Sequence, residues 1–210
     1  SDAASGLPFH AVVGLENTAI SCVACSPWQQ YYNVAVTADG DLYTWERTQR
    51  DSPAVPSSNG NSCPPLPRML YQFQVPISQV ACGKQHSVAV GEQMVYSWGC
   101  GDDGRLGHHS LQSESTPRSI AALEGKGIVQ VSCGFYHTAV VSAGGNVSTW
   151  GQGQHGQLGH GKSKNEMVPR QVDELKSHPI AQVSTGAFHT IVRTMLDGDL
   201  YSFGWAAKGQ

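Results

Sequence analysis

A repeat of about fifty residues constrains the fold of this chain more than any other feature of its sequence. Three histidines recur at intervals of 51 and 52 residues: His86, His137 and His189. An aromatic residue follows each histidine and recurs at intervals of 52 and 53 residues: Trp98, Trp150 and Phe203. A fixed period of this length is the signature of a repeat architecture, in which each copy is one supersecondary unit. We therefore expect a row of similar units rather than one irregular domain.

A fourth, degenerate copy precedes these three, and its Trp45 lies 53 residues before Trp98. Each copy opens with a proline: Pro8, Pro67, Pro117 and Pro169. Residues 1–210 are therefore predicted to form a single domain with repeat units at approximately 8–66, 67–116, 117–168 and 169–210. The first unit differs from the others at 46–66, where an irregular loop insertion rich in Pro, Ser and Asn replaces a glycine-rich stretch.

The local pattern within each unit is that of β-strands. Short segments rich in Val, Ile, Thr and Tyr are separated by hairpin signals such as Ala143-Gly144-Gly145-Asn146. The proline-led start of each unit and the region 128–131 are expected to add outer strands. Three or four antiparallel strands in each period describe the blade of a β-propeller, whose blades bury their apolar faces against one another. The predicted fold class is therefore all-β, and the 24 glycines, 11 prolines and 14% charged residues agree with a turn-rich, compact chain.

Two motifs recur in register. The first, Cys-Gly-x-x-His-Ser/Thr-x-x-Val, occupies 82–90 and 133–141, and the second, Trp-Gly-x-Gly-x-x-Gly-x-Leu-Gly-His, occupies 98–108 and 150–160. They resemble the repeats of the regulator of chromosome condensation family. The resemblance implies a β-propeller that usually has seven blades, of which about four are present here. The remaining blades would then come from the parent chain or from another chain.

Recurrence argues against a catalytic or metal-binding role for the three histidines. A general base is needed once in an active site, whereas these histidines occur once in each unit. A zinc ion needs three or four ligands within about 2.3 Å, and equivalent positions on separate blades do not converge so tightly. A structural role is predicted for the repeated residues: His86, His137, His189, Trp45, Trp98, Trp150, Gly83, Gly134 and Gly186.

The other motifs give no enzyme site. The stretches 99–104 and 151–156 match the dinucleotide-binding pattern Gly-x-Gly-x-x-Gly. A dinucleotide site requires a helix to begin at this pattern. Here each stretch is followed by one residue and then by Leu-Gly-His, which does not indicate a helix. Cys82 and Cys133 hold equivalent positions and are interpreted as small buried apolar residues. Free cysteines of this kind favour a protein of a reducing compartment. No Ser-His-Asp set or carboxylate pair stands in a unique position. We therefore expect no enzyme activity, no metal and no cofactor.

Charge and hydropathy restrict the partners. With 13 Lys and Arg against 16 Asp and Glu, the net charge of −3 argues against nucleic-acid binding, except through chromatin. No apolar run approaches the roughly 18 residues that span a membrane, and the residues after Ser1 lack a basic-then-apolar signal. The sequence therefore favours a soluble cytoplasmic or nuclear protein with a protein partner and no membrane contact.

Function is expected where the units differ, because loops carry specificity on a common scaffold. The candidate partner-binding residues lie in the insertions and between the glycines of the second motif: Trp28, Tyr31, Arg47, Arg50, Asp102, Asp103, Arg105, Gln154 and His155. The preferred hypothesis is a non-enzymatic protein–protein interaction scaffold within a larger regulatory protein. The resemblance implies two alternatives, a guanine nucleotide exchange factor for a small GTPase and a chromatin- or nucleosome-binding module.

Overall fold

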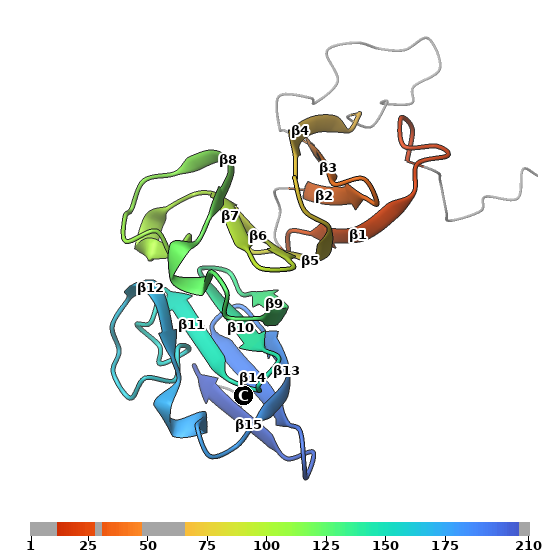
Figure 1. Cartoon of the computed structure of the whole chain (residues 1–210). Coiled ribbons are helices and arrows are strands. Elements are labelled where there is room, and N and C mark those ends of the chain that lie inside the picture. The colour runs from red at the N-terminus through yellow and green to blue at the C-terminus, as the bar shows by residue number, and fades with distance from the viewer. Residues whose placement is uncertain (1–11, 28–30, 48–65, 206–210) are drawn as a thin grey trace, which may run out of the picture.

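The structure, a computed structural model, describes residues 12–27, 31–47 and 66–205 of the 210-residue chain. Its strands form four antiparallel sheets that follow one another along the chain (Figure 1). Within each sheet, every strand pairs with the next strand of the chain. This is the blade arrangement of a β-propeller, which confirms the predicted all-β fold class.

The strands have the following bounds. The first sheet contains β1 (Ile20–Cys25), β2 (Tyr31–Thr37), β3 (Asp41–Arg47) and β4 (Arg68–Gln72). The second contains β5 (Ile77–Cys82), β6 (His86–Gly91), β7 (Val95–Gly99) and β8 (Glu114–Ser119). The third contains β9 (Ile128–Cys133), β10 (His137–Ser142), β11 (Val147–Gly151) and β12 (Glu166–Gln171). The described part of the fourth contains β13 (Ile180–Thr185), β14 (His189–Thr194) and β15 (Leu200–Gly204).

Neighbouring sheets share their apolar cores. Val34 and Leu42 of the first sheet pack with Trp98 of the second. The next core joins second-sheet residues such as Val88 to Trp150 of the third sheet, and a third core, which includes Val141 and Val192, joins the third sheet to the fourth. Each blade therefore supplies half of the core to its neighbour, as the repeat pattern predicts.

The burial pattern of a central strand shows whether one or both faces of its sheet are covered. All six residues of β6 and all six of β10 are buried, because a sheet packs against each of their faces. β14 instead alternates between buried and less buried residues, the pattern of a strand with one covered face. Among the described residues, only the third sheet packs against β14.

The order of the strands about the common centre corrects one prediction. The region 128–131 was expected to form an outer strand, but it belongs to β9, which contacts the equivalent strands β5 and β13. The first strands of successive sheets therefore face one another at the centre. The proline-led strands β4, β8 and β12 lie at the opposite edge of the first three sheets, as expected.

The sheets are offset by one strand from the repeat units read in the sequence. Arg118, which follows Pro117, pairs with Ser97 of the second sheet, and Arg170 pairs with Thr149 of the third. Pro117 and Pro169, which open sequence units, thus lie on the last strands of the second and third sheets. The four sheets run from 20 to 72, 77 to 119, 128 to 171 and 180 to 204.

The repeated histidines form hydrogen bonds between sheets. His86 Nε2 lies 2.9 Å from Thr138 Oγ1, and His137 Nε2 lies 3.0 Å from Thr190 Oγ1. Both imidazoles are essentially inaccessible to solvent. Glycine is required beside them, because a Cβ at Gly134 would overlap the His137 ring. Burial is the largest cause that lowers the pKa of His86 and His137 to about 3, so both rings are neutral at pH 7.

Candidate functional site

One end of the sheets collects the loops that differ between units. The turns at 83–85, 134–136 and 186–188 lie at this end, because they connect the first and second strands of successive sheets. The long loops 100–113 and 152–165 leave β7 and β11 at the same end. We call this end the rim face.

An aromatic cluster lies on the rim face. Phe135, Tyr136 and Phe188 come from two neighbouring turns, and their ring centroids lie 5.7 to 6.1 Å apart. His155 joins from the long loop of the third sheet, 5.2 Å from Phe188, and Trp205 follows β15, 5.7 Å from Phe188. None of the five rings is fully buried, and Trp205 is 49% exposed. Aromatic side chains of this kind are enriched in the centres of protein interfaces.

Two cations pack on one ring of the cluster. The Arg105 guanidinium carbon lies 4.8 Å from the centroid of Tyr136, and Lys84 Nζ lies 5.1 Å from it. Lys84 Nζ also donates a hydrogen bond of 2.7 Å to the Tyr136 hydroxyl. Arg105 donates from Nε to the Asp102 carbonyl at 2.7 Å and forms an ion pair of 3.1 Å with Asp103. These contacts hold the ring of Tyr136 in a fixed position on the rim face.

The structure brings several predicted contact residues together and buries one of them. Asp102, Gln154 and His155 are exposed, and Asp103 is half-buried. Arg105 is only 3% exposed, so its side chain offers little area to a partner. That any of these residues contacts a partner stays a prediction.

The remaining candidates lie in the first sheet or outside the described residues. Tyr31 begins β2 and Arg47 ends β3, but the structure places only their backbone. Trp28 and Arg50 lie outside the described residues. Phe135, Tyr136, Phe188 and Trp205 were not among the residues predicted from the sequence. A signal for the first three was present, since they occupy the variable positions of the Cys-Gly-x-x-His motif or its degenerate copy.

The glycine-rich loops connect two strands of one sheet and serve a structural role. The loop after β7 contains a 3-10 turn, η2 (Asp102–Gly104), and no α-helix begins there, so the dinucleotide fingerprint lacks the helix it requires. Leu106 of this loop is fully buried, and its carbonyl accepts a hydrogen bond of 2.7 Å from Ser97 Oγ. Trp150 of the next sheet donates from Nε1 to the Arg105 carbonyl at 2.8 Å. The loop of one sheet therefore packs directly against the next.

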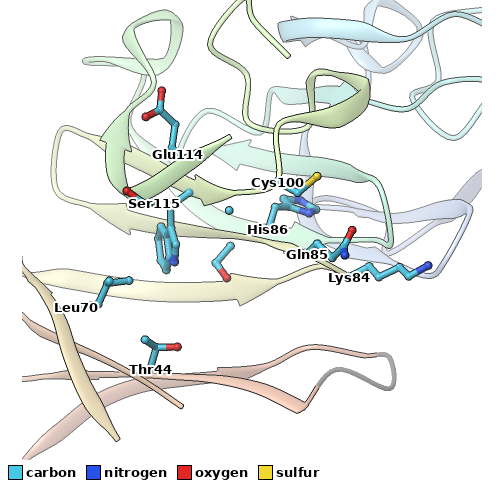
Figure 2. A pocket seen from close by; sticks show the side chains of 11 residues that line it. Thr44, Leu70, Lys84, Gln85, His86, Cys100, Glu114 and Ser115 are labelled. Carbon is cyan, nitrogen blue, oxygen red and sulfur yellow. The ribbon is translucent and has the colours of Figure 1, made fainter. Parts of the chain in front are cut away.

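A partly open cavity of about 400 Å³, which we call the junction cavity, is lined by described residues of the first and second sheets. Figure 2 shows Thr44 and Leu70 of the first sheet on one side and His86, Gln85 and Cys100 of the second on the other. Its lining mixes apolar side chains with hydroxyl, amide, imidazole, thiol and charged groups.

Reactive groups are scarce in the described part of the chain. Burial raises the pKa of Cys82 to about 12 and also raises that of Cys133, so both thiols stay protonated. The described cysteines are free, and no cluster of three or more His, Cys, Asp or Glu side chains among the described residues could hold a metal ion. In the same part of the chain, none of the helices has the length and apolarity needed to cross a bilayer.

The fold and its repeated contacts define a propeller built from repeats of about fifty residues, and comparison with known proteins assigns its family. Family models described as the regulator of chromosome condensation (RCC1) repeat match residues 93–141 and 144–193, and 128–157 and 180–210. The chain belongs to the RCC1 repeat family.

Its relatives are much longer proteins. Human HERC3 is 32% identical over 197 residues, which are 93% of this chain and 18% of that protein. Ultraviolet-B receptor UVR8 of Arabidopsis thaliana is 43% identical over 135 residues, 63% of this chain and 30% of the receptor. E3 ubiquitin-protein ligase HERC2 of Homo sapiens is 34% identical over 182 residues, 85% of this chain and 4% of the ligase. The chain thus spans less than a third of each of these relatives.

Solved structures share the fold. The crystal structure of human WBSCR16 matches 91% of this chain and 50% of its own, with a TM-score of 0.71 and 23% identity. Prp20p of Saccharomyces cerevisiae matches 82% of this chain and 41% of its own, with a TM-score of 0.63 and 23% identity. At these identities, the likeness establishes the fold alone.

Proposed function

We propose that this chain is a non-enzymatic protein–protein interaction scaffold within a larger regulatory protein, and that the rim face binds the partner. The observation that carries the proposal is the aromatic cluster, in which five rings remain accessible on one end of a rigid fold. Tyr136 is held by contacts with Lys84 and Arg105, so little side-chain freedom is lost when a partner covers it. Interfaces concentrate their binding energy in aromatic and Arg side chains of this kind.

The relatives support protein binding as the general activity. Yeast Prp20p has been solved in complex with Kap60, and its binding to Gsp1p and histones has been studied. HERC2 carries a matching region within a ubiquitin-protein ligase. A propeller segment that selects protein partners for a larger molecule is consistent with both observations.

Affinity capture tests the proposal. The 210-residue chain is immobilised, and proteins retained from an extract of its source cell are compared between the parent sequence and Phe188→Ala. The matched control is Leu196→Ala, which removes an apolar side chain that is 82% exposed at the opposite end of the fourth sheet. We expect Phe188→Ala to lower the retention of specific partners at least tenfold and Leu196→Ala to leave it unchanged. Equal retention by all three chains would contradict a role for the rim face.

Two further activities have their own tests. Chromatin binding is favoured by the study of Prp20p with histones, and it predicts nucleosome binding that weakens as salt is raised. The guanine nucleotide exchange alternative predicts faster nucleotide release from a small GTPase, with no cofactor of the propeller's own. A chain that binds no nucleosome at low salt, or accelerates release from none of a panel of GTPases, would remove the corresponding alternative.

A further inference from the structure

The charged residues of this chain are divided unequally between the two ends of the sheets. In the described part of the rim face, the connecting loops carry more cations than carboxylates. These residues are Lys84, Arg105, Lys162 and Lys164, with Asp102 and Asp103. The net charge of these loops is therefore +2, although the whole chain has a net charge of −3.

The loops at the opposite end carry most of the negative charge. They connect the second strand of a sheet to the third, and the last strand of a sheet to the next sheet. Their charged residues are Asp39, Glu92, Glu124, Asp173, Glu174, Asp197 and Asp199, with Lys126 and Lys176. The net charge of these loops is therefore −5.

This difference between the two ends has a direct consequence for a charged partner. Residues 28–30 and 48–65 lie outside the described residues, but they contain one Arg and one Asp and add no net charge to either end. Complementary charge steers the approach of a partner and selects its orientation. An acidic partner is therefore directed to the rim face and away from the opposite end.

Tyr136 supplies a hydrogen-bond donor at the centre of this positive end. Its hydroxyl oxygen accepts a hydrogen bond of 2.7 Å from Lys84 Nζ, so the hydroxyl proton is directed toward a different acceptor. Within the ranges that the structure describes, no group accepts this proton. An ammonium group beside the hydroxyl favours an acceptor that carries a negative charge. A carboxylate of the partner matches this position.

The rings next to Tyr136 add an apolar contact. The Phe188 centroid lies 5.9 Å from that of Tyr136, and the Trp205 centroid lies 5.7 Å from that of Phe188. An apolar side chain of the partner can cover these rings while a neighbouring carboxylate meets the Tyr136 hydroxyl. A nucleic acid also presents anions and rings, but its long row of phosphates meets the net charge of −3 of the whole chain. A short acidic protein segment fits the rim face better.

We propose that the rim face binds an acidic segment of the partner protein, in which a carboxylate accepts the Tyr136 hydroxyl proton beside Lys84 and an apolar side chain covers Phe188 and Trp205. The inference rests on the proposed function, that the rim face binds a partner. It adds the chemical class of the segment that the partner presents.

Selection from a peptide library tests this chemistry without assuming a sequence. A phage-displayed library of random dodecapeptides is selected on the immobilised 210-residue chain at low salt. We expect the enriched peptides to contain about twofold more Asp and Glu than the unselected library, together with an aromatic or aliphatic residue. Enriched peptides without an excess of acidic residues would contradict the inference, and so would a selection that enriches none.

The best enriched peptide then becomes a fluorescent probe, and its binding is followed by anisotropy. Tyr136→Phe should weaken binding about tenfold, because it keeps the ring and removes a hydrogen bond to a charged acceptor. The matched control is Tyr201→Phe on β15, outside the rim face, which should bind as the parent does. Thermal unfolding followed by circular dichroism checks that both variants fold.

The charge of each molecule is varied separately. A peptide with Asn and Gln in place of Asp and Glu should bind at least about tenfold more weakly, which needs no change in the protein. Lys164→Gln, on the rim face, should weaken binding about threefold at low salt and less at high salt, because dissolved ions screen exposed charges. Lys126→Gln, at the opposite end, is its control and should leave the affinity unchanged.

Three further results would overturn the inference. They are equal affinity for the acidic peptide and its amide form, equal affinity of the parent and Tyr136→Phe, and equal affinity for a single-stranded oligonucleotide of the same charge as the peptide. The last would make the rim face a general site for polyanions. Partner capture that depends on Phe188 while the selected peptides are neutral would reject the acidic segment and leave the proposed function standing.

Discussion

At the scale of single residues, the hydrogen bond between a buried histidine and a hydroxyl of the next sheet recurs from one boundary to the next. The Thr190 hydroxyl is the hydrogen-bond partner of His137 Nε2, and no solvent reaches the ring to replace it. The Thr190 hydroxyl also donates to the Gln157 carbonyl, so it joins a strand, the next sheet and a loop. Removal of such a group leaves buried polar atoms unpaired, and this costs more than the bond itself contributes.

Thr190→Val tests this contact. The substitution keeps the shape of the side chain but leaves the imidazole and the carbonyl without their partner, so we expect the free energy of unfolding to fall by about 2 kcal/mol. Urea denaturation of the 210-residue chain followed by circular dichroism measures it. Thr116→Val, at an exposed position, should change the stability by less than about 0.5 kcal/mol. Equal effects of the two substitutions would show that the buried hydroxyl is dispensable.

The buried histidines also set the acid limit of the fold. Their pKa values of about 3 lie below the ordinary value near 6.5, so the unfolded chain binds these protons first. Their contribution to stability is complete above pH 6.5 and is lost as the pH falls from there toward 3. In this window each histidine adds a slope of up to about 1.4 kcal/mol per pH unit.

His137→Gln isolates one of these slopes. Glutamine does not titrate, so the unfolding free energy of the variant should depend less steeply on pH between 6 and 4 than that of the parent. The difference in slope should correspond to nearly one proton taken up on unfolding. Carboxylates titrate in both chains and cancel in the comparison. Denaturation at a series of pH values gives both slopes, and identical slopes would place the His137 pKa near its ordinary value.

At the scale of elements, the long loops hold neighbouring sheets together as much as the strands do. The loop after β7 buries Leu106 completely, whereas Leu111, five residues later in the same loop, is 57% exposed. The two leucines therefore form an internal comparison of buried and exposed positions.

Leu106→Ala should lower the free energy of unfolding by about 3 kcal/mol, because it opens a cavity at the boundary of two sheets. Leu111→Ala should change it by less than about 0.5 kcal/mol. Thermal unfolding of both variants beside the parent provides the measurement. A small effect at Leu106 would mean that the loop is not part of the cooperative structure.

The repeat itself made most of these elements predictable from the sequence. The histidine and tryptophan intervals gave the blades and the shared cores, since the same residues must pack in the same way in each copy. The inner position of β9 was not predictable, because it depends on contacts with β5 and β13, each about fifty residues away. The aromatic cluster was missed because Tyr136 and Phe188 occupy variable positions of the motif.

At the scale of the whole molecule, stability is distributed over the boundaries between sheets. Opening the third sheet disrupts the core that it shares with the second and the core that it shares with the fourth. Opening the fourth sheet disrupts one core within the described residues. Arrays in which each unit contacts only its neighbours unfold preferentially from the units with fewer contacts.

Hydrogen exchange of the 210-residue chain therefore should not be uniform. We expect amides of β14 to exchange at least tenfold faster than those of β10, because local opening of the fourth sheet exposes less apolar surface. Amides of β6, whose residues are also all buried, serve as the control and should exchange as slowly as those of β10. Val192→Ala, in the core between the third and fourth sheets, should accelerate exchange in β14 while leaving β6 unchanged. If the substitution accelerated all three strands equally, the four sheets would unfold as one unit, and the contacts between blades would be stronger than this account of the fold requires.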